Sequence, residues 1–448
     1  MKLTAQLDVD VLALEQEDEV TCLLAFDAPV PESTDQTSGQ PGNLIVFVVD
    51  RSGSMDGDPL VAVKTSLHAI VDRMKPADAF GVVIFDDAAE IAVPIRVMAD
   101  HHRPTVHALI EGITPGGSTD LSAGYLLGLT EARRMMGATG ASLIILSDGH
   151  ANAGIRDGAT LGGLAATAAS EGISTATIGL GAGYDETLLA LLATQGQGSH
   201  RFAATPDDAM AVVSQEAGDL LSKAILNAFV RIRPEVPELV DRFTLHHDLP
   251  CWQAADPDGA TVFVISLGDL YAGEHREILV SFGVPALGAV GPQHLATFTI
   301  DYVCLPSLTT ESITWPLGVN IVPGEQASVR QLNPVVRTAR LLIEATKAKK
   351  AAVEALLNGD TAAASQMMEA QAQELTLALA ACDDSSPGGQ QLRERLAEES
   401  EQAHKLARAA RERESMLAVK SFTEDIQMEA TGRNDQFKRQ RARNRREY

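Results

Sequence analysis

Cysteine, basic charge and long apolar runs are all scarce in this 448-residue chain. Its four cysteines lie far apart and form no CxxC pair: Cys22, Cys251, Cys304 and Cys382. A disulfide framework or a cysteine-based zinc site is therefore not expected, and a reducing cytoplasm is the default location. No stretch approaches the roughly 20 consecutive apolar residues of a membrane helix, and the N-terminus lacks the apolar segment of a secretory signal.

Lys and Arg total 36 against 60 Asp and Glu, which gives a net charge of −24. Such a surface repels nucleic acid and anionic lipid, so the main body is not expected to bind either. The last sixteen residues, 433–448, differ, because they carry seven Lys or Arg against Asp435 and Glu447. This basic tail is interpreted either as a disordered terminus or as a segment that docks on nucleic acid or on an acidic surface of the protein's own kind.

A central segment alternates buried strands with helices. Apolar runs at 43–49, 80–85, 142–146 and 173–180 are typical of strands buried on both faces of a parallel sheet. Further elements expected are a hairpin strand at 91–98, a strand at 200–203, and helices at 58–74, 104–113, 121–136, 161–170, 186–194 and 207–224. The pattern predicts a doubly wound, mostly parallel, Rossmann-like α/β sheet over 43–224.

The segments on either side of the α/β region have different patterns of apolar and polar residues. Residues 3–13 and 20–28, and short runs within 229–322, alternate apolar and polar residues as antiparallel strands do. We expect residues 1–30 and 229–322 to form one discontinuous β-sandwich into which the α/β domain is inserted. Residues 325–430 are predicted to be a helical hairpin or bundle, with helices over 329–357, up to 381, and 390–420, and with a break at Asn358-Gly359-Asp360.

Three turns supply oxygen-bearing side chains at the ends of predicted elements. Asp50-Arg51-Ser52-Gly53-Ser54 follows the first buried strand, Gly116-Gly117-Ser118-Thr119-Asp120 precedes a helix, and Ser147-Asp148-Gly149 follows another buried strand. Ligands of open α/β sheets bind beyond the carboxyl ends of the strands. Five oxygens with two formal negative charges suit a hard divalent cation, most naturally Mg²⁺, with Ca²⁺ or Mn²⁺ as alternatives. The predicted ligands are Asp50, Ser52, Ser54, Thr119 and Asp148.

The order DxSGSM, GGSTDL, SDG closely resembles the von Willebrand factor A (VWA) domain over residues 43–224. The resemblance implies a metal-ion-dependent adhesion site at the same five residues. Gly268 to Glu274 and the following strand resemble the β domain of bacterial proteins described as inter-alpha-trypsin-inhibitor-like or calcium-activated-chloride-channel-like. Some channel-like relatives carry an HExxH protease motif, which is absent here; His275-Arg276-Glu277 is not one.

Other polar residues near these turns have ordinary interpretations. Asp120 is expected to be the N-cap of its helix, and His150 either touches a ligand at the rim or is only solvated. The glycine-rich segment 179–183 lacks the spacing of a dinucleotide-binding loop. His101-His102 has no third candidate ligand and is expected at the surface.

The leading hypothesis is a non-enzymatic protein-binding scaffold. The cation leaves one coordination position open, and a Glu or Asp of an unidentified protein partner completes it. A first alternative is metal-assisted hydrolysis, which requires a general base that the sequence does not single out. A second alternative, implied by the resemblance, is a VWA subunit of an ATPase-driven chaperone-like or chelatase-like assembly.

Overall fold

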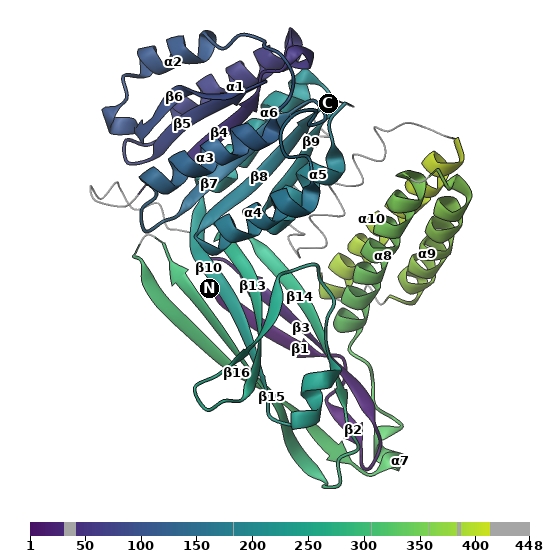
Figure 1. The fold of residues 1–448 in the computed structure, drawn as a ribbon. Helices are drawn as coiled ribbons and strands as arrows, with labels where there is room; N and C mark the ends of the chain where they lie inside the picture. The colour runs from purple at the N-terminus through teal and green to yellow at the C-terminus, as the bar shows by residue number, and fades with distance from the viewer. Residues whose placement is uncertain (31–41, 182, 306, 358, 383–386, 413–448) are drawn as a thin grey trace.

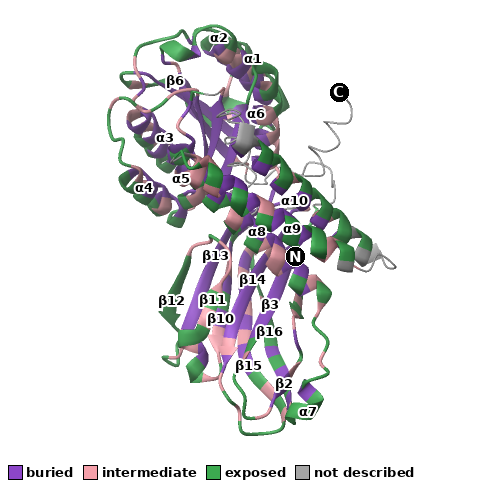
Figure 2. Cartoon of the chain, turned by 90° about the vertical axis from the view of Figure 1, so that its right-hand side faces the viewer, coloured by how far each residue is buried: buried purple, intermediate pink, exposed green. Residues whose placement is uncertain are grey.

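The computed structural model describes residues 1–30, 42–181, 183–305, 307–357, 359–382 and 387–412. An α/β domain lies at one end, long β-strands extend away from it, and three long helices lie beside the strands (Figure 1). Buried residues run through the strands and along the facing sides of the helices (Figure 2). No helix in the described ranges is both long and apolar enough to cross a membrane.

The α/β domain is built on a six-stranded sheet with the order β6-β5-β4-β7-β8-β9. Its strands are β4 (Leu44–Asp50), β5 (Ala79–Phe85), β6 (Ala89–Val97), β7 (Ala141–Ser147), β8 (Ile173–Leu180) and β9 (Gln197–Ala203). All neighbouring pairs are parallel except β5 and β6, which form the predicted hairpin. The doubly wound, mostly parallel sheet is confirmed.

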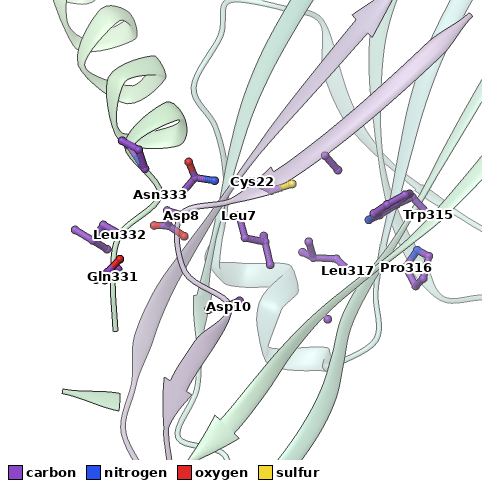
Figure 3. Close-up of a pocket in the computed structure, with 13 residues that line it drawn as sticks. Leu7, Asp8, Asp10, Cys22, Trp315, Pro316, Leu317, Gln331, Leu332 and Asn333 are labelled. Carbon is purple, nitrogen blue, oxygen red and sulfur yellow. The ribbon is translucent and has the colours of Figure 1, made fainter. Parts of the chain in front are cut away.

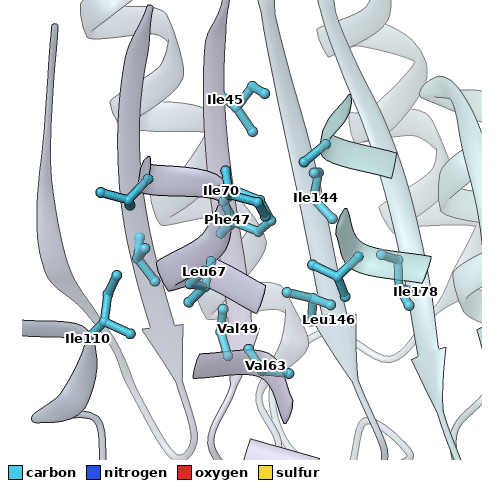
Figure 4. Packing of buried hydrophobic residues seen from close by; sticks show 14 of the residues in the cluster. Ile45, Phe47, Val49, Val63, Leu67, Ile70, Ile110, Ile144, Leu146 and Ile178 are labelled. Carbon is cyan, nitrogen blue, oxygen red and sulfur yellow. The ribbon is translucent and has the colours of Figure 1, made fainter. Parts of the chain in front are cut away.

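Helices cover both faces of this sheet. One face carries α1 (Asp58–Arg73), α2 (Arg103–Glu111) and α6 (Pro206–Leu220), whose buried residues share one hydrophobic core with Ile45, Phe47 and Val49 of β4; part of this core is shown in Figure 4. The other carries α3 (Leu121–Met135), α4 (Gly158–Ser170) and α5 (Glu186–Gln195). Alternate β4 residues point to opposite faces, so an uninterrupted apolar strand is needed to fill both cores. Two short 3₁₀ turns complete the domain, η1 (Gly53–Met55) and η2 (Met98–Asp100).

The predicted end of the last helix of this domain was wrong. The helix was expected to reach Ala224, but α6 ends at Leu220 and β10 (Lys223–Pro234) begins almost at once. The Ser222 hydroxyl donates a 2.7 Å hydrogen bond to the Asp219 carbonyl at the helix end. Apolar residues continue across the junction, so hydropathy alone does not mark it.

Two further sheets share one hydrophobic core. The first has the order β1-β3-β14-β11 and the second β12-β13-β10-β15-β16-β2. Their strands are β1 (Lys2–Leu7), β2 (Val11–Ala13), β3 (Asp18–Asp27), β11 (Phe243–Leu245), β12 (Cys251–Ala255), β13 (Thr261–Tyr271), β14 (His275–Val284), β15 (Gly291–Cys304) and β16 (Thr309–Val322), with η3 (Pro237–Arg242) preceding β11. β3 pairs antiparallel with β14 along its whole length, so the two ends of the chain around the α/β domain contribute to the same sheets.

The single strand expected over 3–13 was wrong. β1 and β2 belong to different sheets, and the segment that begins at Asp8 separates the two strands. The Asp8 Oδ1 accepts hydrogen bonds from the backbone N–H groups of Val9 and Thr21, both at 2.8 Å. Burial raises the pKa of this carboxyl. Apolar and polar residues keep alternating from Leu3 to Val11, through the turn between the two strands. The sequence pattern therefore does not reveal that the chain passes from one sheet to the other.

The predicted C-terminal helices are present. They are α7 (Gly324–Ala327), α8 (Pro334–Leu357), α9 (Thr361–Ala381) and α10 (Pro387–Glu412). The first long helix begins at Pro334 instead of 329, and Asp360 caps α9 by accepting from the Ala363 N–H. α8 packs on the first β-sheet through Val336 and Ala339. Asn358, the last part of the third predicted helix, 413–420, and the predicted basic tail, 433–448, lie outside the described residues.

A pocket of about 540 Å³ opens among the β-strands, away from the α/β domain (Figure 3). It is lined by residues of β1, β16 and the segment that leads into α8, including Leu7, Trp315, Leu317 and Leu332. Trp315 and Leu332 are 44% and 51% exposed. The pocket contains none of the predicted metal ligands.

Candidate metal centre

The predicted ligands lie where the order of strands reverses. β4 is followed in sequence by β5 on one side, whereas β7 pairs with its other side. In open α/β sheets, ligands usually bind beyond the carboxyl ends of the strands at such a reversal, which here means the ends of β4 and β7. Asp50 ends β4 and Ser147 ends β7, so two of the oxygen-bearing turns begin side by side.

Asp50 is fully buried and firmly held. Its Oδ1 accepts from the Ser52 N–H at 2.8 Å, and its Oδ2 accepts from the Ser147 hydroxyl at 2.6 Å. Each carboxylate oxygen retains acceptor capacity after one hydrogen bond. The carboxylate is therefore oriented and still able to bind a cation.

A chain of hydroxyls links the first turn to the second carboxylate. The Oγ atoms of Ser52 and Ser54 are 3.2 Å apart, and the Ser54 hydroxyl donates to the Asp148 Oδ1 at 2.7 Å. A β-carbon placed on Gly149 would lie 3.6 Å from both the Ser54 Oγ and the Thr119 Oγ1. The structure thus brings Asp50, Ser52, Ser54, Thr119 and Asp148 to one corner of the domain.

Glycines let the middle turn approach the first. The Gly53 N–H donates to the Gly117 carbonyl at 3.0 Å, and the Gly116 N–H donates to the Arg51 carbonyl at 2.6 Å. A β-carbon on Gly116 or Gly117 would come within about 2 Å of the Asp86 or Asp87 carboxylate. A larger residue at either position would force the Asp86 or Asp87 side chain to move from its place beside this turn.

The electrostatics of the corner favour a cation. Burial raises the pKa of Asp50, and the charge of Asp86 raises it further. Burial also raises the pKa of Asp148, and the charge of Asp50 adds to that rise. Arg51 is turned aside, forming ion pairs with Asp86 at 3.0 Å and Glu90 at 2.9 Å. Among the described residues neither Asp50 nor Asp148 has an ion pair with Lys or Arg, and an all-oxygen donor set of charge −2 fits a hard divalent ion.

None of the five predicted ligands would bind the ion through nitrogen or sulfur. Within the described ranges there is no group of three or more His, Cys, Asp or Glu residues arranged to hold a metal. The predicted set has only two carboxylates and depends on hydroxyls, so it belongs to a different kind of site. Hydroxyl and carboxylate oxygens favour Mg²⁺, Ca²⁺ or Mn²⁺ over softer ions.

The secondary candidates occupy ordinary positions. Asp120 is the N-cap of α3 and accepts from the Ala123 N–H at 2.9 Å, as predicted. His150 is 69% exposed and its Nδ1 lies 3.7 Å from Asp185. His101 contacts the Phe80 carbonyl, whereas His102 contacts the Thr105 hydroxyl, so these two side chains have separate partners.

The glycine-rich segment 179–183 has a packing role at its first residue. A β-carbon on Gly179 would lie 2.2 Å from the ring of Tyr184. Ala182, inside the segment, lies outside the described residues. The close contact explains this glycine without a bound nucleotide.

Sequence reasoning missed four residues that shape the centre. Ser147 holds Asp50, and the Asn152 side chain accepts from the Thr119 N–H at 2.8 Å. Asp86 orients Arg51, and Asp87 accepts from the Ser118 N–H at 3.0 Å. Asp86 and Asp87 directly follow a predicted strand, as Asp50 does, and that placement was the signal available in the sequence.

Comparisons with known proteins agree with the fold of the α/β domain. The model of the von Willebrand factor type A domain matches residues 45–216. The chain is similar to uncharacterized protein YfbK of Escherichia coli (28% identity; 40% of this chain and 32% of YfbK) and to uncharacterized protein sll0103 of Synechocystis (24% identity; 66% and 69%). It is also similar to bovine inter-alpha-trypsin inhibitor heavy chain H1 (31% identity; 25% and 13%). The chain thus spans about a third of YfbK and a small part of the heavy chain.

Two solved structures share the fold over most of the chain. A von Willebrand factor type A protein from Catenulispora acidiphila has a TM-score of 0.66 and 15% identity, covering 86% of this chain and 91% of that one. The ArnB paralog VWA2 from Sulfolobus acidocaldarius has a TM-score of 0.59 and 15% identity, covering 96% and 97%. The shared fold therefore extends beyond the α/β domain. With the motif, the sheet topology and the matched family model in agreement, residues 45–216 are a von Willebrand factor type A (VWA) domain.

Proposed function

We propose that the VWA domain binds a divalent cation through Asp50, Ser52, Ser54, Thr119 and Asp148, and that the bound ion captures an acidic side chain of a protein partner. The observation that carries this proposal is the pair of carboxylates formed by buried Asp50 and half-buried Asp148, which no Lys or Arg in the described ranges neutralises. Both pKa values are raised, so the pair favours the arrival of positive charge.

Mg²⁺ is the ion proposed. It prefers oxygen ligands and usually keeps several waters when it binds proteins. The oxygens of the five predicted ligands, some of them acting through bound water, would fill all but one coordination position of the ion. A Glu or Asp of the partner can take the remaining position. The ion would supply the positive centre for that carboxylate, and the domain's turns would supply the surrounding contacts.

The wider role proposed is that of a scaffold. The β-sheets and the C-terminal helices lie away from the metal corner (Figure 1), so they remain available when a partner occupies it. A hydrolase at the same ion would require a general base close to the two carboxylates. His150 lies nearby in sequence, but it is exposed and faces Asp185, which gives hydrolysis no specific support.

The test is capture of a partner by the immobilised full chain in Mg²⁺ and in EDTA. We expect a partner to be retained in Mg²⁺, released by EDTA and lost with Asp50→Asn. Asp56→Asn is the matched control, because Asp56 is an exposed carboxylate of the same turn and outside the predicted set. A partner that Asp50→Asn retains as well as the native chain does, or that remains bound in EDTA, contradicts the proposal.

A further inference from the structure

The two facing β-sheets differ in width. The sheet that ends at β1 has four strands, whereas the sheet that contains β16 has six. The outermost of those six, β2, pairs only with Asn320 to Val322 of β16, so among the described strands the rest of that side of β16 is an edge. Side chains of β1 and β16 line the pocket of Figure 3. We call this side of the two sheets, where the pocket opens, the β1–β16 seam.

Core-facing side chains are exposed at the β1–β16 seam. Directly opposite residues of an antiparallel pair point to the same face of a sheet. Trp315 lies opposite Phe298, and Ile313 lies opposite Ile300. Phe298 and Ile300 are fully buried in the core that the two sheets share, so Trp315 and Ile313 face that core as well. Trp315 is nevertheless 44% exposed and Ile313 only half-buried, because the narrower sheet stops before it covers them.

The outer edge of β1 presents backbone hydrogen-bonding groups. The Asp8 N–H donates to the Thr21 carbonyl of β3 at 2.9 Å. Alternate residues of a strand direct their backbone groups to opposite sides, so the N–H and C=O groups of Leu3 and Ala5 point away from β3. Among the strands that the structure describes, none pairs with that side of β1. Such an edge is a template for a further strand.

The edge of β16 is a poorer template than that of β1. The Asn320 N–H donates to the Asp10 carbonyl at 2.8 Å, so the same alternation turns the backbone of Pro316 outward. Proline has no N–H to offer, and it is a residue by which edge strands avoid pairing. β1 contains no proline. A strand in the seam is therefore expected to pair with β1 and to place its side chains over Trp315.

The charge of the pocket favours a basic ligand. Its lining includes the carboxylates of Asp8 and Asp10 and no Lys or Arg (Figure 3). Arg330 interacts electrostatically with Asp8, but its guanidinium forms an ion pair with Asp18. Burial raises the pKa of Asp8, so a positive neighbour would stabilise its ionised form.

We propose that an extended segment of a protein partner adds to β1 as a fifth, antiparallel strand of the narrower sheet, with alternate apolar side chains over Trp315 and Ile313 and a Lys or Arg beside Asp8 and Asp10. The other neighbours in this sheet are all antiparallel. Since β1 runs towards Asp8, the basic residue lies at the N-terminal end of the segment. In strand addition, main-chain hydrogen bonds supply affinity and alternate side chains supply specificity.

The seam is distinct from the metal corner, because its pocket contains none of the predicted metal ligands. Residues 31–41 of the same chain, which come after β3, do not match the proposed ligand. They include no Val, Ile, Leu, Met, Phe, Tyr or Trp, so they have no apolar side chains to place over Trp315.

The test uses the acetylated and amidated peptide Lys-Thr-Val-Thr-Val-Thr-Val-Thr and the full chain with Trp252→Phe, which leaves Trp315 as the only one of two tryptophans. We expect saturable binding with a blue shift of the Trp315 emission, unchanged by EDTA or by Asp50→Asn. In an antiparallel pair the Val nitrogens face β1 and the Thr nitrogens face away. Methylation of the three Val nitrogens should weaken binding about 10-fold or more, and methylation of three Thr nitrogens, the matched control, should not.

Variants of the chain test the same contacts. Ala5→Pro removes one outward N–H without removing a bond to β3 and should weaken peptide binding about 10-fold, whereas Ala5→Val should bind normally. Asp10→Asn should weaken binding about 2-fold to 5-fold, as loss of an exposed ion pair does. If Ala5→Pro fails to fold, the methylated peptides still test the pairing on the native edge.

Three results would overturn the proposal. The first is absence of saturable binding, or binding that leaves the Trp315 emission unchanged. The second is equal affinity of the peptides methylated on Val and on Thr. The third is binding that appears only after removal of residues 413–448, which would assign the seam to the chain's own C-terminal segment.

Discussion

The Ser54 hydroxyl donates a 2.7 Å hydrogen bond to the Asp148 carboxylate, 94 residues further along the chain. This contact joins the turn after β4 to the turn after β7 and holds the two predicted acidic ligands, Asp50 and Asp148, close together. It closes a site whose members come from three separate turns, with Thr119 contributed by the third.

Replacing Asp148 should separate metal binding from folding. Asp148→Asn removes a carboxylate whose pKa is raised by burial and by the charge of Asp50, so without metal the variant should melt no lower than the native chain. The native chain should gain about 2.7 kcal/mol at Mg²⁺ concentrations of 100 times Kd, whereas the variant gains nothing there. Thermal melts with and without Mg²⁺ measure both effects. Equal Mg²⁺-induced stabilisation of the two proteins would remove Asp148 from the site.

The β-sheets should depend on the N-terminal strands. β3 lies between β1 and β14, so a fragment of residues 43–322 exposes the edge and core face of β14. We expect that fragment to aggregate or to melt without cooperativity, and residues 43–224 to fold alone. Size-exclusion chromatography and thermal melts of the two fragments provide the measurement. A monomeric, cooperatively melting 43–322 fragment would show that the N-terminal strands are dispensable.

Adjacent lysines of α8 should differ sharply in importance. Lys349 is buried and its Nζ lies 2.6 Å from the Glu399 carboxylate of α10, whereas Lys350 is 64% exposed and pairs with Asp248. Lys349→Met removes the Lys349 ammonium from this buried ion pair and should cost about 3–5 kcal/mol. Lys350→Met, the matched control, should cost less than about 1 kcal/mol. Urea unfolding followed by helical circular dichroism compares them, and equal losses would refute the buried pair.

A histidine and a glutamate of β14 should make stability depend on pH. The hydrogen bond to Glu277 raises the pKa of His275 to about 9, with Asp27 also contributing. Burial alone would raise the pKa of Glu277, but His275 and Arg395 outweigh it and lower that pKa to about 2. The contribution of His275 is complete below pH 6.5 and is lost as the pH rises through about 9. The contribution of Glu277 is complete above pH 4.5 and is lost as the pH falls towards about 2.

Glu277→Gln tests this coupling directly. Without the carboxylate, the pKa of His275 should move back towards 6.5, and Arg395 of α10 should lose its 2.9 Å ion pair with β14. NMR titration of the His275 ring follows the first effect, and chemical-shift changes in α10 follow the second. An unchanged His275 titration would show that Asp27 alone sustains the shift.

The sheet and its turns were accessible from the sequence because their signals are local. Ile45, Phe47 and Val49 fill one core while Leu44, Val46 and Val48 fill the other, so an unbroken apolar run predicts a strand covered on both faces. Asp50 and Asp148 directly follow such runs, which places both at the same edge. Asp86 and Asp87 follow a strand in the same way and could have been found by the same reasoning.

Features that depend on tertiary contacts were not accessible. Nothing between Leu7 and Val11 marks a change of sheet, and apolar residues continue from α6 into β10 across Ser222. His68 of α1 and His107 of α2 lie with their Nδ1 atoms 2.5 Å apart only because the two helices pack side by side and each is rotated about its axis so that its histidine faces the other helix. Helical spacing fixes which residues share a face, whereas the partner of that face is set by the assembled domain.

Calorimetric titration with Mg²⁺ is the most direct test of the metal centre. The native chain and Asp56→Asn should bind one Mg²⁺ per chain with equal affinity, and Asp50→Asn should show no binding while keeping its far-ultraviolet circular dichroism. Mg²⁺ binding by a folded Asp50→Asn protein with native affinity would contradict the assignment of this site.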